Sequence, residues 1–276
     1  DGEVVLAPVA GVEEEETAPV EDAPMMLAAP AAENTPIAVP TEALTFDKNK
    51  GAITGIDADW LAQNKDKPLS VTIPAEIGDT PVTSIGQNAF NGKKVVAVDF
   101  SNATNLEKID NQAFMQSPVA SVDLSETKVT TIGKFAFGDC TSLENVILPN
   151  ALTVLGSSVF TDCKHVESIR LANSPEGVVF ALPENLISIG YQCFKNCFAA
   201  DVNAKVVIPE SVTTISGEAF KDIHITQIIF KKIVDPWRNE DYSGYDDSAM
   251  TPPSGCDRII VLPDNKCFVA YSEQVR

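Results

Sequence analysis

Apolar residues recur along the chain in a block that first appears near Val71 and returns at a nearly constant interval. In each block an Ile or Leu stands five residues before a Phe. The pairs are Ile85 and Phe90, Ile109 and Phe114, Ile132 and Phe137, Leu155 and Phe160, Ile189 and Phe194, and Ile215 and Phe220. The period is about 23 residues, and one longer interval, from Phe160 to Phe194, holds an insertion. The pattern predicts a repeat solenoid, because a single coil of this size cannot bury its own apolar edge.

A second apolar block follows most of these phenylalanines, with spacings of three and then two residues. The final step of two places two apolar side chains on one face of a short strand. Examples are Val95, Val98 and Phe100, then Val119, Val122 and Leu124, then Leu143, Val146 and Leu148, and later Ile225, Ile228 and Phe230. We therefore expect a right-handed leucine-rich-repeat solenoid of about seven coils, mainly β-structure with short helical turns. The glycines that follow the Ile or Leu, which are Gly86, Gly133, Gly156 and Gly190, are expected to adopt positive φ.

Composition divides the chain into four parts. Residues 1–43 contain ten acidic residues, six prolines and no basic residue, which is typical of an extended tail or stalk. Residues 44–70 form a segment that leads into the repeats, and residues 71–234 form the solenoid. Residues 235–276 hold an inserted loop, a last strand and a C-terminal cap.

The formal net charge of −19 narrows the classes of partner. No run of Lys and Arg is present to neutralise phosphates, so nucleic acids and anionic membrane surfaces are not expected partners. No apolar stretch approaches the roughly 18 residues of a membrane-spanning helix. The chain begins at Asp1 without a Met, which we interpret as a sign that an export signal or lipid anchor has been removed.

Two segments carry a specific family resemblance. The sequence VTSIGQNAF from Val82 to Phe90, and VTTIGKFAFGDC from Val129 to Cys140 with its continuation to Pro149, resemble the BspA-like leucine-rich repeats of bacterial surface and secreted proteins. The resemblance extends from about Leu44 to the C-terminus. It implies an extracellular or surface-attached protein that adheres to host matrix proteins or to other cells.

Cysteine spacing indicates core packing rather than metal binding. Cys140, Cys163 and Cys197 each stand three residues after a repeat Phe, so we expect them to be buried, reduced and stacked. Cys193 replaces the small residue that usually precedes the Phe. The remaining pair, Cys256 and Cys267, flanks the last strand, where a disulfide that closes the cap is one alternative and free thiols are the other.

Motifs for catalysis and for cofactors are missing from the sequence. The only histidines, His165 and His224, belong to different coils from the cysteine pair Cys193 and Cys197, so no zinc pattern results and we expect no metal or cofactor. No nucleophile, base and orienting residue converge in a motif, and no glycine-rich phosphate loop is present. The sequence therefore predicts a protein that is not an enzyme.

Two regions are candidates for a binding surface. Residues 235–255 interrupt the repeat and contain Trp237, Tyr242 and Tyr245 beside several acids. Long loops without regular structure are often functional, so these aromatic side chains could contact a sugar or peptide. The alternative is a packed cap whose aromatic residues shield the last coil.

The second region is the outward face of the strands. Alternation places one column of residues there, namely Asp99, Asp123, Ile147, Arg170, Val207, Ile229 and Val261. The early members are acidic and the later ones aliphatic. Contiguous exposed aliphatic residues commonly mark an interface, so Arg170, Val207, Ile229 and Val261 are predicted binding residues. The alternative is that the tail, a cap or another subunit covers them.

The pattern and the resemblance together favour a non-enzymatic binding or adhesion protein. Its expected partner is a protein or glycan on a host or bacterial surface, recognised through the strand face or the Trp237 loop. The alternative is a structural spacer module within a larger surface assembly. The sequence leaves the oligomeric state open.

Overall fold

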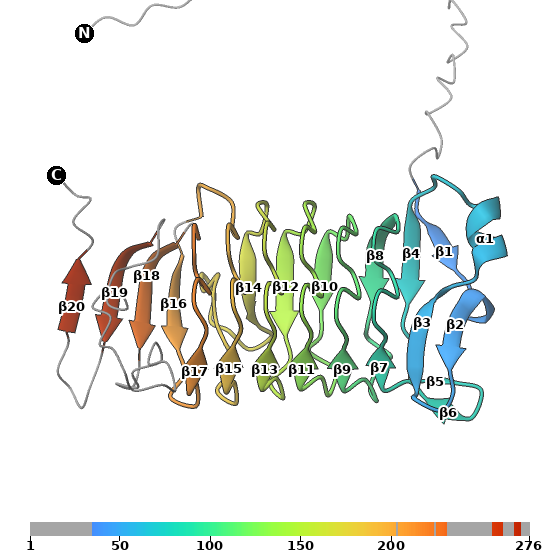
Figure 1. The fold of residues 1–276 in the computed structure, drawn as a ribbon, viewed down its shortest axis with the longest axis horizontal. Helices are drawn as coiled ribbons and strands as arrows, with labels where there is room; N and C mark the ends of the chain where they lie inside the picture. The colour runs from blue at the N-terminus through green and yellow to red at the C-terminus, as the bar shows by residue number, and fades with distance from the viewer. Residues whose placement is uncertain (1–34, 203, 224, 231–255, 262–267, 272–276) are drawn as a thin grey trace, which may run out of the picture. The chain divides into compact units, whose positions relative to one another are not determined.

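The computed structural model describes residues 35–202, 204–223, 225–230, 256–261 and 268–271 of the 276-residue chain. All the described residues belong to one compact unit, Asn34–Arg276. This unit is a β-solenoid of about six turns, and successive coils lie beside one another in chain order (Figure 1). The prediction of a leucine-rich-repeat solenoid built mainly from β-structure is confirmed.

Each coil that carries a repeat Phe gives one two-residue strand to a sheet of eight strands, and two longer strands complete the sheet. In sheet order the eight strands are β17 (Thr214–Ile215), β15 (Ser188–Ile189), β13 (Val154–Leu155), β11 (Thr131–Ile132), β9 (Lys108–Ile109), β7 (Ser84–Ile85), and the longer β3 (Ala52–Ile56) and β2 (Leu44–Asp47). All neighbours pair in parallel except β2 and β3, which are antiparallel. The repeated Ile or Leu occupies the same register in every short strand, which explains its constant distance from the Phe.

The second apolar block forms another row of strands, divided into three sheets. The first sheet contains β1 (Ile37–Val39), β4 (Leu69–Thr72) and β8 (Val95–Asp99), and the second contains β10 (Ser121–Asp123), β12 (Asn145–Leu148) and β14 (Ser168–Leu171). The third contains β16 (Lys205–Ile208), β18 (Ile225–Phe230), β19 (Cys256–Val261) and β20 (Phe268–Tyr271). Only β20 pairs antiparallel in this row.

The N-terminal end of the solenoid includes residues that the composition places in the tail and in the segment that leads into the repeats. Strand β1 pairs in parallel with β4, and Val39 is buried, so residues 37–43 contribute to the first sheet and its core. The short helix η1 (Thr41–Ala43) forms the end of this segment. Residues 1–34 of the expected tail lie outside the described residues.

A short helix and a hairpin complete this end. The helix α1 (Ala58–Gln63) begins where the carboxylate of Asp57 accepts hydrogen bonds from the backbone N–H groups of Asp59 and Trp60, at 3.1 and 2.9 Å. The hairpin pairs β5 (Glu76–Ile77) with β6 (Thr80–Pro81).

Among the described residues the short helices are η1 and α1, and the turns that carry the repeat phenylalanines are not helical. The residue two positions before each Phe has positive φ, which is the left-handed region; these residues are Asn88, Gln112, Phe135, Ser158, Gln192 and Glu218. A left-handed residue in each turn prevents a right-handed helix. The Phe backbone N–H instead donates to the next coil, as in the 2.7 Å bond from Phe90 to the carbonyl of Ala113.

The six repeat phenylalanines form one buried column. Adjacent rings are stacked with centroids 5.0 Å apart at Phe90 and Phe114, and 5.8 Å apart at Phe137 and Phe160. The insertion in the long interval adds Phe180, whose ring centroid lies 5.2 Å from that of Phe194. Burying a Phe ring stabilises a fold by about 3–5 kcal/mol relative to Ala, so this column is a large contributor to the apolar core of the solenoid.

Glycines that follow the short strands are required for a different reason from the one predicted. Gly86, Gly133, Gly156 and Gly190 do not have positive φ. A Cβ atom at Gly190 would lie 2.4 Å from the carbonyl carbon of Gly156 and 2.5 Å from the backbone nitrogen of Ser157. The backbone of the preceding coil thus lies too close to Gly190 to admit a side chain there, whereas two other coils carry Asp110 and Ser216 at the same register.

The predicted core cysteines Cys140, Cys163 and Cys197 are confirmed as buried free thiols, and Cys193 is also buried and free. The Sγ atoms of Cys140 and Cys163 each donate to the carbonyl of the Phe one coil earlier, at 3.1 Å. Ser117 occupies the same register and makes the same bond through its hydroxyl, at 2.7 Å. Cys267 lies outside the described residues, so both alternatives for its pair with Cys256, a disulfide or free thiols, stay open.

Candidate binding site

The outward column of the strand face is only partly continuous. Asp123, Ile147 and Arg170 are successive register partners across β10, β12 and β14, as the alternation predicts. The sheet ends at β14, however, where the insertion supplies an isolated bridge between Ile169 and Phe180. Arg170 and Val207 therefore belong to different sheets and do not form one surface stripe.

Val261, the predicted last member of the outward column, lies one residue out of register with Val207 and Ile229. Ile229 pairs with Val207 on one side and with Ile260 on the other, whereas Val261 pairs with Phe230. The period of the sequence does not determine this register, because the repeat is interrupted between Phe230 and Cys256. Val207 and Ile229 are also half-buried, so they expose only part of their side chains.

The acids of the early strand face have a local structural role. The carboxylates of Asp99 and Asp123 each accept a hydrogen bond from the backbone N–H two residues later, at 2.9 Å. This is the geometry of an Asx turn, which ends a strand. The bond from Ser101 lowers the pKa of Asp99. The second predicted region, with Trp237, Tyr242 and Tyr245, lies outside the described residues and stays a prediction.

Exposed large apolar side chains gather instead on one coil. Among the described residues these are Ile187, with 47% of its surface exposed, and Tyr191, with 46% exposed. Ile187 immediately precedes β15, and Tyr191 follows that strand by two residues. We call Ile187 and Tyr191, together with Gln192, Glu218 and Lys221, the Tyr191 cluster.

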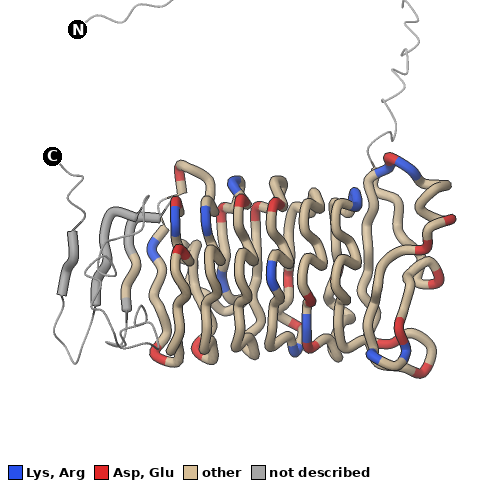
Figure 2. The backbone as a smooth tube through the Cα atoms, viewed as in Figure 1, with Lys and Arg blue, Asp and Glu red and all other residues tan. Residues whose placement is uncertain are grey.

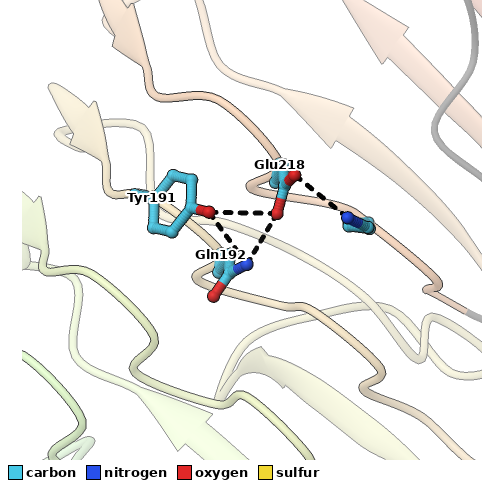
Figure 3. A network of polar contacts seen from close by, with 4 residues as sticks. Tyr191, Gln192 and Glu218 are labelled. Carbon is cyan, nitrogen blue, oxygen red and sulfur yellow. Dashed lines mark hydrogen bonds and ion pairs between the residues drawn. The ribbon is translucent and has the colours of Figure 1, made fainter.

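The polar members of the Tyr191 cluster form one hydrogen-bond network between two coils (Figure 3). The Tyr191 hydroxyl donates to Oε2 of Glu218 at 3.1 Å, and Nε2 of Gln192 donates to the same oxygen at 2.6 Å. Nε2 of Gln192 also donates to the Tyr191 hydroxyl at 3.0 Å. Nζ of Lys221 donates to the other carboxylate oxygen, Oε1, at 3.0 Å. These bonds fix the orientation of the exposed ring.

The backbone beneath the Tyr191 cluster is held by the core. Gln192 and Glu218 have φ of 53° and 58°, the left-handed geometry found at this register in every coil. The backbone N–H of Phe194 donates to the carbonyl of Ala219 in the next coil, at 2.8 Å. Phe194 itself is fully buried in the ring column. The side chains of the cluster thus project from a backbone whose position the core determines.

Electrostatics give the Tyr191 cluster a stable protonation state. Hydrogen bonds from Gln192 and then Lys221 lower the pKa of Glu218 to about 2. The bond to Glu218 raises the pKa of Lys221, while partial burial and then Glu218 raise the pKa of Tyr191. At neutral pH Glu218 is ionised, Lys221 is charged and Tyr191 keeps its proton, so the two charges of the cluster cancel.

Periodicity did not predict the Tyr191 cluster, but a comparison of registers contains a signal. The register of Tyr191 holds Gln87, Asn111, Lys134, Ser157 and Gly217 in the other coils, and the register of Ile187 holds Thr83, Glu107, Thr130, Thr153 and Thr213. Both registers are polar or small elsewhere. Tyr191 and Ile187 are the large apolar exceptions in these two registers, and they lie on the same coil.

The repeat family is decided by a match along most of the chain. Residues 67–178 and 178–248 match the profile of the BspA type Leucine rich repeat region, in six copies. The chain belongs to this family. No curated protein matches the chain. The family match confirms the BspA-like resemblance of the repeat segments.

Several solved structures resemble the chain more distantly. The T. pallidum leucine rich repeat protein has 21% identity over 69% of this chain and 70% of its own, with a TM-score of 0.41. A leucine rich cell surface protein from Faecalibacterium prausnitzii has 18% identity over 72% of this chain and 56% of its own, with a TM-score of 0.37. A leucine-rich repeat protein from Bacteroides ovatus has 20% identity, coverage of 79% and 74%, and a TM-score of 0.36.

The described part of this BspA-type chain contains no group of His, Cys, Asp or Glu arranged to hold a metal ion. It also contains no helix long and apolar enough to cross a membrane. Basic and acidic positions are intermingled along the described coils, without a long basic stretch (Figure 2). Burial raises the pKa of the core thiols, so these cysteines are unsuited to nucleophilic chemistry.

An open groove of about 550 Å³ lies at the other end of the eight-stranded sheet, between residues of β2, β3, β7 and β9. Four of its charged lining residues form two ion pairs. Lys50 lies 3.4 Å from Asp47, and Lys108 lies 2.9 Å from Asp110. It lacks an exposed aromatic side chain among its lining residues, and the Tyr191 cluster is the stronger candidate site.

Proposed function

We propose that this BspA-type chain is a non-enzymatic binding protein, secreted or attached to the bacterial surface, that recognises a protein or glycan partner through the Tyr191 cluster. The observation that supports the proposal is the exposure of Ile187 and Tyr191 at registers that are polar or small in the other coils. Neither side chain is needed for the core at its position.

The physical state of the cluster suits recognition. Tyr is enriched among residues that dominate binding energy, because it combines a large apolar face with a polar tip. Ordering a flexible side chain on binding costs about 0.5–1.5 kcal/mol. The hydrogen bonds from Tyr191 to Glu218 and Gln192 reduce this cost, since they hold the ring in place before a partner arrives.

A panel of immobilised host matrix proteins, bacterial surface proteins and glycans tests the proposal by biolayer interferometry. The variants are Ile187→Asp and Tyr191→Ala. The control is Lys134→Ala, which removes an exposed side chain from the register of Tyr191 two coils earlier. All three variants should retain the circular dichroism spectrum and melting temperature of the wild type.

The proposal expects the wild type and Lys134→Ala to bind at least one panel member, while Ile187→Asp and Tyr191→Ala lose that binding. Equal binding by all variants would show that the partner contacts another surface. If the wild type binds no panel member, the proposal fails and the structural spacer function is favoured. Fractionation of the producing bacterium tests the localisation, which requires the protein in the surface or secreted fraction.

A further inference from the structure

We infer that the Tyr191 cluster binds an uncharged pyranose sugar, with the C–H face of the sugar on the Tyr191 ring and its hydroxyls at Gln192 and Glu218. The inference rests on the proposed function, because it names the ligand class of the same surface. It follows from the shape of the ring site, its charge, its remaining hydrogen-bonding capacity and its size.

The Tyr191 ring is held by its edge. Its hydroxyl bonds to Glu218 and Gln192, whereas its carbon atoms line the neighbouring coil at Gly217, where a Cβ would lie 4.0 Å from Cδ2 of the ring. Gly217 places no side chain against the ring. The ring thus provides a flat apolar surface of fixed orientation, which matches the flat C–H face of a pyranose.

Charge in the cluster favours an uncharged ligand. Glu218 and Lys221 are paired at 3.0 Å, so their opposite charges offset each other. The chain has a formal net charge of −19, which disfavours anionic sugars in particular. A neutral sugar requires no counter-charge and does not break the ion pair.

Hydrogen-bonding capacity remains at both polar side chains beside the ring. A carboxylate has about four lone-pair sites, and Tyr191, Gln192 and Lys221 use three of those on Glu218. The amide oxygen of Gln192 is directed away from Glu218 (Figure 3). The Glu218 carboxylate and the Gln192 amide oxygen can each accept a hydrogen bond from a hydroxyl group. Neighbouring hydroxyls of a sugar present two donors at once.

The size of the apolar surface distinguishes a sugar from a folded protein. A stable protein interface buries about 800 Å² on each partner and has an apolar centre of several residues. The exposed apolar part of the cluster is one ring and one Ile side chain. This surface suits a small ligand better than a folded protein.

Fluorine NMR of protein labelled with 3-fluorotyrosine tests the inference on the full chain. The sequence contains four tyrosines, so few resonances are expected, and Tyr191→Phe assigns one of them by its loss. Uncharged methyl glycosides of glucose, galactose and N-acetylglucosamine are titrated, with glucuronic acid and glucosamine as charged comparisons. We expect one or more uncharged sugars to shift the Tyr191 resonance saturably with a dissociation constant in the millimolar range.

Variants separate stacking from an indirect structural effect. Saturation-transfer signals of the bound sugar should fall at least tenfold with Tyr191→Ala, fall less with Tyr191→Phe, which keeps the ring, and stay unchanged with Lys134→Ala. If no uncharged sugar shifts the Tyr191 resonance, the inference is overturned. The proposed function then survives if Tyr191→Ala still loses a protein partner from the panel, and both fail if no panel member binds.

Discussion

Four thiols buried in the core make the stability of the solenoid sensitive to alkaline pH. Burial raises the pKa of Cys140 to about 12 and raises the pKa of Cys163, Cys193 and Cys197 as well. In the unfolded chain a thiol has a pKa of about 8.5. Between these values the unfolded chain loses protons that the folded chain keeps, so the stabilisation is complete below about pH 8.5 and is lost as pH rises.

The magnitude is large because the four groups act together. Each thiol changes the free energy of unfolding by about 1.4 kcal/mol per pH unit above its unfolded pKa. At pH 10 one thiol contributes a loss of about 2 kcal/mol, and four contribute about 8 kcal/mol, against a typical domain stability of about 5–15 kcal/mol. We therefore expect the described solenoid to approach unfolding near this pH.

Urea denaturation followed by circular dichroism, in reducing buffer from neutral pH to about pH 10, measures this dependence. Other groups titrate in the same range, so the variant Cys163→Ser isolates the thiol contribution. Ser117 shows that a hydroxyl makes the same bond to the preceding Phe carbonyl, so the variant should fold. The stability difference between wild type and Cys163→Ser should shift in favour of the variant by about 1.4 kcal/mol per pH unit above pH 9. A difference that does not change with pH would refute the reasoning.

Three further predictions follow from the packing and the charges. Gly190→Ala should destabilise the fold by several kcal/mol, because its Cβ would overlap the backbone of the preceding coil. The control Gly217→Ala, whose Cβ meets only a ring atom at 4.0 Å, should change the melting temperature little. Equal effects of the two substitutions would contradict the close approach at Gly190. Phe137→Ala should cost about 3–5 kcal/mol in urea denaturation, and a loss under about 1 kcal/mol would show that the ring column is not a large contributor to the core. Ligand binding at Tyr191 should be constant from about pH 4 to pH 8, because the pKa of Glu218 is about 2 and that of Tyr191 is raised; a titration of affinity within this range would contradict the assigned charges.

The period of the sequence was sufficient to predict which residues form the core. A repeat places the same register at the same depth in every coil, so one pattern located the Phe column and the buried cysteines together. The reason for Gly190 could not be predicted, since the steric overlap arises between backbones of two neighbouring coils. The register of Val261 could not be predicted either, because it follows a segment without the period.

The surface was harder to predict than the core for a physical reason. Burial constrains every inward residue, whereas an exposed position tolerates many side chains and gives no periodic signal. Strand alternation correctly aligned Asp123, Ile147 and Arg170, but it could not show that the sheet ends there. The sequence shows that Tyr191 departs from a register that is polar or small in the other coils, but its exposure and its contacts with Glu218 come only from the structure.

The affinity of the first identified ligand for wild type, Tyr191→Ala and Lys134→Ala tests the central claim most directly. If the Tyr191 cluster is the recognition site, Tyr191→Ala binds at least about tenfold more weakly, a loss of about 1.4 kcal/mol, and Lys134→Ala binds as the wild type does. Equal affinities for all three proteins, with unchanged melting temperatures, would show that the cluster does not take part in recognition.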